Sequence, residues 1–181
     1  MDNKVIIIIA AVLVFVVGMY NIMLKKKNKV KTSFSSLDVM LKKRYDVMPN
    51  LVSMVQKYMA HESELLKELA EIRTGVENAK TQKEKLELGA KSEKVMKKVQ
   101  ISMESNPDLK SNQNMLHMQA VLNNIEEEIA AARRAYNAQV EDYNTFIGMI
   151  PFNIFALILG FRKFDQFTIT NEERESRNWM G

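Results

Sequence analysis

The side chains best suited to catalysis or metal binding are few in this sequence. It has no cysteine and two histidines, His61 and His117. Glu62 follows His61, but no second histidine stands four residues after His61, so the helix motif of zinc proteases is absent. Without cysteine, disulfides, zinc–thiolate sites and thiol nucleophiles are excluded. We therefore expect no catalytic residue and no metal site.

One cluster of charges could be mistaken for a carboxylate site. Glu126, Glu127 and Glu128 are followed by Arg133 and Arg134. Adjacent residues fan outward around a helix, so these side chains are expected to form a solvated face with Glu-to-Arg pairs. The sequence also lacks a glycine-rich phosphate loop, a G-x-S-x-G turn and an acidic calcium loop. We expect no cofactor, no enzyme activity and no nucleic-acid partner.

The elements around these residues are expected to be long helices. An apolar stripe with alternating spacings of three and four indicates a helix that packs on partners. This stripe consists of Met115, Met118, Leu122, Ile125, Ile129, Ala132 and Tyr136. Tyr143 and then Phe146 or Ile147 continue it.

A second heptad stripe runs from Phe34 to Val76. Pro49 interrupts it without changing its phase, which predicts a helix kink and not a reversal of the chain. Arg44 and Glu62 also fall on this stripe, and we expect both to extend their charged ends to the edge of the bundle.

The segment 81–104 is expected to form the middle arm of the bundle. Asn106-Pro107-Asp108 breaks it, and Ser111 is a reasonable N-cap for the next helix. In this three-helix arrangement the first and third helices run parallel. Apolar stripes at 34–51 and 136–147 are then left without partners in the chain, and they would need neighbouring molecules.

The residues Val5 to Leu24 form an uncharged run of 20 residues. As a helix this run is about 30 Å long, which matches a bilayer core. The run predicts a transmembrane helix that is retained in the mature protein. A cleaved signal peptide is the competing interpretation. Five lysines follow it, so the positive-inside rule places the rest of the chain in the cytoplasm. They are either a topology signal alone or also a contact surface for anionic lipid. These lysines are Lys25, Lys26, Lys27, Lys29 and Lys31.

The segment Ile150 to Phe161 is strongly apolar but too short to cross a bilayer as a helix. It is expected to be buried either at the membrane interface or against neighbouring subunits. The second site is favoured, because parallel first and third helices would place the segment far from the anchor. The predicted self-association residues are Tyr136, Tyr143, Phe152, Phe155, Leu157 and Phe161.

The predicted fold class is all-α, with an N-terminal transmembrane helix, an elongated coiled-coil-like bundle of three long helices and a short apolar segment. The bundle is followed by a charged tail with a solvated or disordered end. The predicted boundaries are 1–4 for an outer tail, 5–24 for the transmembrane helix, 25–33 for the basic segment, 34–149 for the bundle, 150–161 for the apolar segment and 162–181 for the polar tail.

Four stretches of the sequence resemble the LemA family. They are LKKRYDVMPNLV at 41–52, YMAHE at 58–62, NPDLKSNQN at 106–114 and AARRAYNAQVEDYNTFIGMIP at 131–151. The resemblance covers roughly the first 165 residues, and Phe34 departs from it, because the family commonly has tryptophan there. It implies a bacterial single-pass membrane protein with an elongated helical bundle. It implies no reaction, and it suggests membrane-shaping or envelope-linked roles.

Two functional hypotheses follow from these observations. The first is a scaffold at the inner membrane that self-associates as a homo-oligomer in contact with the lipid bilayer. The second is a regulatory adaptor that binds another membrane protein, such as a protease or a kinase.

Overall fold

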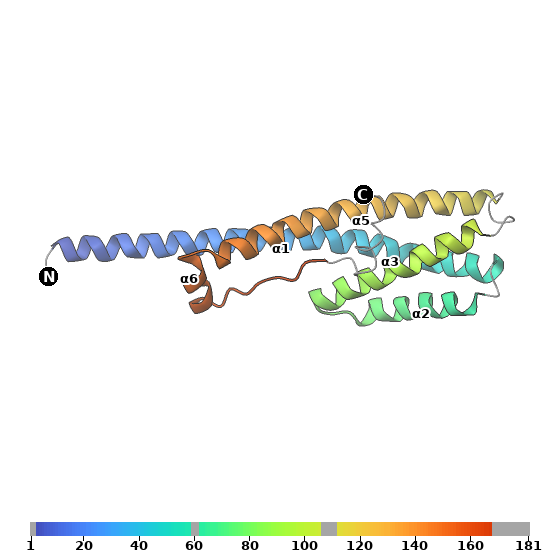
Figure 1. Ribbon diagram of the computed structural model, residues 1–181, viewed down its shortest axis with the longest axis horizontal. Coiled ribbons are helices and arrows are strands. Elements are labelled where there is room, and N and C mark those ends of the chain that lie inside the picture. Colours follow the sequence, from blue (N-terminus) through green and yellow to red (C-terminus); the bar gives the residue numbers. More distant parts are fainter. Residues whose placement is uncertain (1–2, 59–61, 106–111, 168–181) are drawn as a thin grey trace, which may run out of the picture. The chain divides into compact units, whose positions relative to one another are not determined.

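The computed structural model describes residues 3–58, 62–105 and 112–167. All regular secondary structure in these ranges is helical, which confirms the all-α prediction (Figure 1). The helices are α1 (Asn3–Tyr58), α2 (Ser63–Asn78), α3 (Gln82–Glu104), α5 (Gln113–Gly148) and α6 (Phe152–Ile158). Most of the polar tail and the predicted N-cap Ser111 lie outside the described residues.

The chain divides into two compact units, and each is described by itself. The anchor unit consists of Met1–Ser35 and Arg134–Gln166. The bundle unit consists of Ser36–Arg133 and Phe167–Gly181. Helices α1 and α5 each contribute to both units, whereas α2 and α3 belong to the bundle unit and α6 belongs to the anchor unit.

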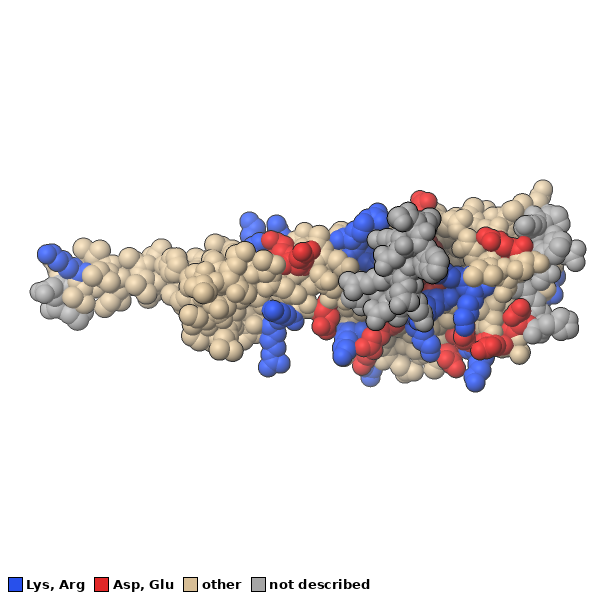
Figure 2. All heavy atoms as spheres, viewed as in Figure 1, with Lys and Arg blue, Asp and Glu red and all other residues tan. Residues whose placement is uncertain are grey.

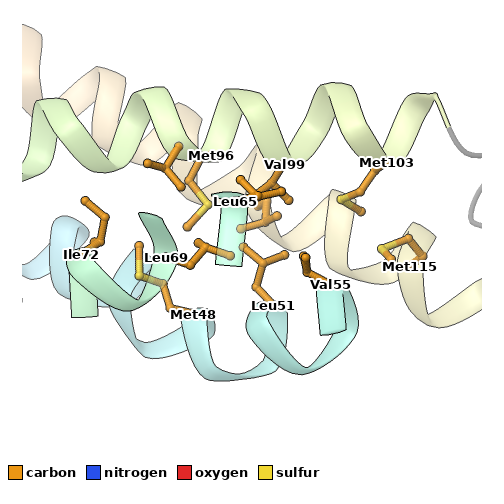
Figure 3. Packing of buried hydrophobic residues seen from close by; sticks show 12 residues of the cluster. Met48, Leu51, Val55, Leu65, Leu69, Ile72, Met96, Val99, Met103 and Met115 are labelled. Atoms are coloured by element: carbon orange, nitrogen blue, oxygen red, sulfur yellow. The ribbon is translucent and has the colours of Figure 1, made fainter. Parts of the chain in front are cut away.

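Four helices enclose the core of the bundle unit (Figure 3). Each contributes the apolar face that its sequence periodicity predicts, because burial of that face is the main favourable term in folding. The core residues are Met48, Leu51 and Val55 of α1, Leu65, Leu69 and Ile72 of α2, Val95, Met96, Val99 and Met103 of α3, and Met115 and Leu122 of α5.

The first stripe of the sequence is divided between two helices. Helix α1 continues through Pro49, as the unbroken phase predicts, and ends at Tyr58. Helix α2 then begins at Ser63, so the single helix expected from Phe34 to Val76 is wrong. The reason is physical: periodicity records which face of a helix is buried and contains no information about the direction in which the chain runs.

The start of α3 is fixed by a capping box. The Thr81 hydroxyl accepts from the Glu84 backbone N–H at 3.2 Å, and the Glu84 carboxylate accepts from the Thr81 N–H at 2.9 Å. These two bonds satisfy donors that the first helical turn leaves without partners. The threonine-to-glutamate spacing was visible in the sequence, although the turn there was poorly marked by glycine or proline.

Helix α5 runs antiparallel to α1, which corrects the predicted parallel arrangement. In the anchor unit the Phe34 ring lies 5.8 Å from the Tyr136 ring. Lys26, which precedes Phe34, forms an ion pair with Asp142, which follows Tyr136, at 2.6 Å. Residue numbers therefore rise along α1 as they fall along α5. The additional reversal before α2 changes the direction of every later helix.

Candidate membrane-proximal site

The first turns of α1 expose apolar side chains on every face. All residues from 3 to 15 are exposed, and Ile7 and Val14 are 67% and 70% exposed. Within the described residues, α1 is the helix that is long and apolar enough to cross a membrane, as judged by length and composition. Apart from a basic side chain at its N-terminal end, this stretch is drawn without Lys, Arg, Asp or Glu in Figure 2.

Burial in α1 begins before the apolar run ends. Met19 is 3% exposed and Met23 is 0% exposed, so other parts of the anchor unit cover them. The Phe161 ring lies 5.9 Å from the Tyr20 ring, in an edge-to-face contact. The ammonium of Lys27 lies over the Phe161 ring, 5.3 Å from its centroid. The C-terminal end of the apolar segment therefore packs beside the last turns of the predicted transmembrane helix.

This position corrects the expectation that residues 150–161 lie far from the anchor. Helix α5 returns along α1, and the Phe146 ring near its end contacts the Phe152 ring of α6 at 4.1 Å. Phe155 and Phe161 are half-buried within the chain, and Ala156 is 4% exposed. Gly160 has a φ of +72°, a conformation that glycine adopts without steric strain, and it ends the turn after α6.

The opposite face of this segment is apolar and uncovered. Leu157 is 84% exposed and Ile158 is 73% exposed, and both lie on α6. Ile154, one turn earlier on α6, is 56% exposed, and Ile150 before the helix is 82% exposed. Ile154, Leu157 and Ile158 are three and four positions apart on α6 and therefore share one side of that helix. Ile150 adds a further exposed apolar side chain just before the helix begins. We call Ile150, Ile154, Leu157 and Ile158 the α6 patch.

An extended segment, 161–167, follows α6 and is held by side chains of α5. The Tyr143 hydroxyl donates to the Arg162 carbonyl at 3.1 Å. Asn144 makes two bonds to Phe164, donating to its carbonyl at 2.9 Å and accepting from its N–H at 3.0 Å. This segment was predicted only as the beginning of a polar tail.

Tyr136 takes part in the same arrangement, because its hydroxyl donates to the Asp165 carbonyl at 2.6 Å. Tyr136 and Tyr143 are both 0% exposed, so their assignment as self-association residues is wrong. The stripe that the sequence left without partners is paired within the chain. Burial also raises the pKa of Tyr143 above its ordinary value of 10.0. The repeated Tyr-Asn pairs, seven residues apart, were the sequence signal for this role.

The five lysines after the apolar run do not have one common environment. Lys26 forms its ion pair with Asp142 and lies 5.0 Å from the Phe146 ring centroid. Lys25 and Lys29 line a hollow of about 730 Å³ between α1 and α5. Lys31 is exposed. Contact with lipid headgroups therefore remains a prediction, and Lys26 and Lys27 also make contacts within the chain.

Arg44 is the largest fully buried side chain of the bundle unit, so the expectation that it reaches the bundle edge is wrong. Its guanidinium donates to the Ser92 hydroxyl at 2.8 Å and to the Gly89 carbonyl at 3.2 Å, and it pairs with Glu126. A charged side chain can enter a core when hydrogen bonds and an opposite charge replace water. The position of Arg44 on an apolar stripe was the available signal.

The expected solvated face on α5 is correct for Glu127 and Arg134, which are exposed, but Glu128 and Arg133 reach other helices. Glu128 pairs with Lys43 of α1 at 2.7 Å, and Arg133 pairs with Glu93 of α3 at 3.1 Å. These contacts join α5 to its neighbours and do not form a catalytic constellation. No group of three or more metal-binding side chains occurs in the part of the chain that the structure describes. His61 lies outside that part.

Phe167 closes the described part of the chain by packing into the bundle unit. It is 2% exposed, and its ring lies 5.7 Å from the Arg133 guanidinium. A Cβ at Gly89 would be 2.9 Å from the Phe167 ring, so glycine provides the space for it. Sequence analysis missed Phe167, because no periodic pattern surrounds it.

A family model described as the LemA family matches residues 33–178. The chain is also similar to magnetosome proteins MamQ 1 and MamQ 2 of Paramagnetospirillum magneticum, with 25% identity over 178 residues. The alignment covers 82% of this chain and 64% of each relative, so the chain spans less than two thirds of their length.

Proposed function

This chain belongs to the LemA family, and we propose that it is a non-enzymatic scaffold that is anchored in the inner membrane and self-associates through its bundle unit. The observation that supports this proposal is the continuity of α1. The apolar run, the lysines and the core residues Met48, Leu51 and Val55 belong to one helix of 56 residues. A lone enzyme domain on a membrane tether would not need such continuity.

The surface proposed for self-association lies between α3 and α5. A groove of about 410 Å³ lies there, and its lining includes the buried core residues Met96, Met103 and Leu122. The exposed residues of the lining are polar or charged, such as Lys97, Gln100 and Glu127. Apolar side chains surrounded by polar ones in a groove favour contact with another helix face. A second copy of this bundle unit would supply one.

Photo-crosslinking in native membranes tests self-association. A photoreactive amino acid at Gln100, which lines the groove, should give a covalent dimer of the chain. The matched control is Lys67, an exposed residue of α2 that does not line this groove. Equal dimer yields from the two positions, or none from Gln100, would contradict this interface.

The second candidate function is a regulatory adaptor that uses the same groove for a different membrane protein. Two of the residues that line the groove are methionines, Met96 and Met103, which are buried in the free chain but have unbranched thioether side chains that adapt to varied partners. The same experiment separates the two functions. The scaffold gives crosslinks to a second copy, and the adaptor gives crosslinks to a different protein.

Orientation is tested with a single cysteine in a chain that has none. Lys80, an exposed residue before α3, is suitable for replacement by cysteine. The positive-inside rule places it in the cytoplasm, so a membrane-impermeant thiol reagent should label Lys80→Cys only after cell lysis. Labelling of Lys80→Cys in intact cells would show that the orientation is the opposite of the one proposed.

A further inference from the structure

We propose that α6 is an interfacial membrane helix, whose outward patch inserts among the acyl chains just below the headgroups on the side of the lysines. The patch is Ile150, Ile154, Leu157 and Ile158. This inference rests on the proposed membrane anchor, and it adds a second, separate contact between the chain and the bilayer.

The depth of the segment follows from its contacts with α1. Phe161 packs against Tyr20, and Tyr20 lies four residues before Leu24, the end of the apolar run. At 1.5 Å per residue, this contact lies about 6 Å inside the end of the run. Interfacial helices bury their apolar faces roughly 5–10 Å into the boundary between headgroups and acyl chains. The two depths agree.

The composition of the segment fits the same boundary. No charged residue occurs between Asp142 and Arg162, a stretch that contains the end of α5 and the whole of α6. Lys26 and Lys27, which contact the aromatic rings of this region, are placed at the level of the headgroups. Asn153 is the polar residue of α6, and its side chain accepts from the Ile154 N–H at 2.8 Å. Its amide oxygen therefore already has a partner in the chain.

Lipid suits the α6 patch better than a second copy of the chain does. Phe161, which follows α6, packs on Tyr20, five residues after the exposed apolar surface of residues 5–15 of α1, and that surface has the composition of one in contact with lipid. A second protein at this depth would have to displace lipid from both surfaces. The exposed side chains are aliphatic, and acyl chains match them without any specific partner.

Fluorescence quenching of the full-length protein in vesicles tests the proposal. Leu157→Cys is labelled with an environment-sensitive fluorophore in phosphatidylethanolamine–phosphatidylglycerol vesicles that contain spin-labelled lipid. Two reference positions are labelled in the same way: Val12→Cys in the apolar run, and Ile101→Cys, which is a similarly exposed apolar residue of the bundle unit. Circular dichroism of each variant confirms that it is helical, and Ile158→Cys replaces Leu157→Cys if that variant does not fold.

We expect the fluorophore at 157 to be quenched by a spin label near the headgroup and to lose quenching by aqueous iodide. The fluorophore at 101 should show the reverse. Iodide quenching at 157 equal to that at 101 overturns the proposal. The proposal is also overturned if the probe at 157 is shielded from both quenchers and becomes accessible only when the protein is diluted with lipid, because that result indicates a contact between copies. A probe at position 12 that is not quenched by lipid would instead refute the anchor on which the proposed function depends.

Discussion

The buried Arg44–Glu126 pair predicts an asymmetry between two substitutions. Arg44 is 0% exposed, whereas the Glu126 side chain is 34% exposed. Glu126→Met would leave the guanidinium charge buried with only neutral partners, at Ser92 and Gly89. Arg44→Met would leave a carboxylate that can turn toward water, and it would fill the vacated space with an apolar side chain. Removal of the more exposed partner should therefore destabilise the bundle unit more.

The magnitudes follow from the same contacts. Loss of one partner from a buried pair costs 3–5 kcal/mol, and the two remaining hydrogen bonds place Glu126→Met near 3 kcal/mol. Arg44→Met should cost about 1 kcal/mol, because Ser92 still donates to the Gly89 carbonyl at 2.8 Å. The double variant should lie near Arg44→Met, which gives a coupling energy of about 2–3 kcal/mol.

Hydrogen exchange of the full-length protein in detergent, read by mass spectrometry over α3, measures these differences. A loss of about 3 kcal/mol should accelerate exchange on the order of 100-fold, since 1.4 kcal/mol corresponds to a factor of ten. The matched control is Glu127→Met, at the exposed neighbouring position, which should change stability by less than about 0.5 kcal/mol. A larger effect for Arg44→Met than for Glu126→Met would refute the reasoning, because it would show that packing of the arginine and not its charge is decisive.

Three further predictions concern individual contacts. Phe167→Ala should accelerate tryptic cleavage after the exposed Lys163, followed by mass spectrometry, because the buried ring holds the extended segment; an unchanged rate would contradict this. Burial raises the pKa of Tyr45 above 10.0, so the unfolded state loses this proton at a lower pH than the folded state does. The stability of the fold should therefore fall as the pH rises above 10. Helicity measured against pH should decrease less for Tyr45→Phe than for the unchanged protein. The backbone N–H groups of Thr81 and Lys80 donate to the Glu84 carboxylate and hold its pKa below 4.5. The stabilisation from Glu84 is therefore present above that pH and is lost as the pH falls through the lower folded value. Glu84→Gln should make hydrogen exchange in the first turn of α3 less sensitive to acid, and an identical pH dependence would refute this.

The sequence allowed prediction of the buried faces because periodicity is a local property. Leu51, Leu69 and Leu122 were all assigned to apolar stripes, and all three are in the core. Arg44 was misplaced for a related reason. The stripe indicated a buried position, but the sequence cannot show that Ser92, Gly89 and Glu126 meet there from two other helices. A long side chain without visible partners was therefore assigned to the surface.

The candidate site was harder to predict, because it depends on the number of reversals in the chain. Periodicity did not reveal the change of chain direction between α1 and α2. The direction of α5 and the position of α6 were therefore predicted wrongly. The composition of residues 150–161 predicted a surface that must be covered, and this stays a prediction. The expected position of the segment, far from the anchor, was wrong.

The exposure of the α6 patch explains why the position of α6 beside α1 matters for the stability and solubility of the protein. The four residues of the α6 patch are 56–84% exposed within the chain. At roughly 1.5–3 kcal/mol for a fully buried aliphatic side chain, their transfer from water to an apolar environment is worth about 4–9 kcal/mol. That energy is comparable with the whole stability of many domains, so a patch left uncovered in water would favour aggregation. In the position that we propose, beside the last turns of the apolar run, the bilayer would supply the covering surface, and the change of chain direction before α2 is what returns α6 to α1.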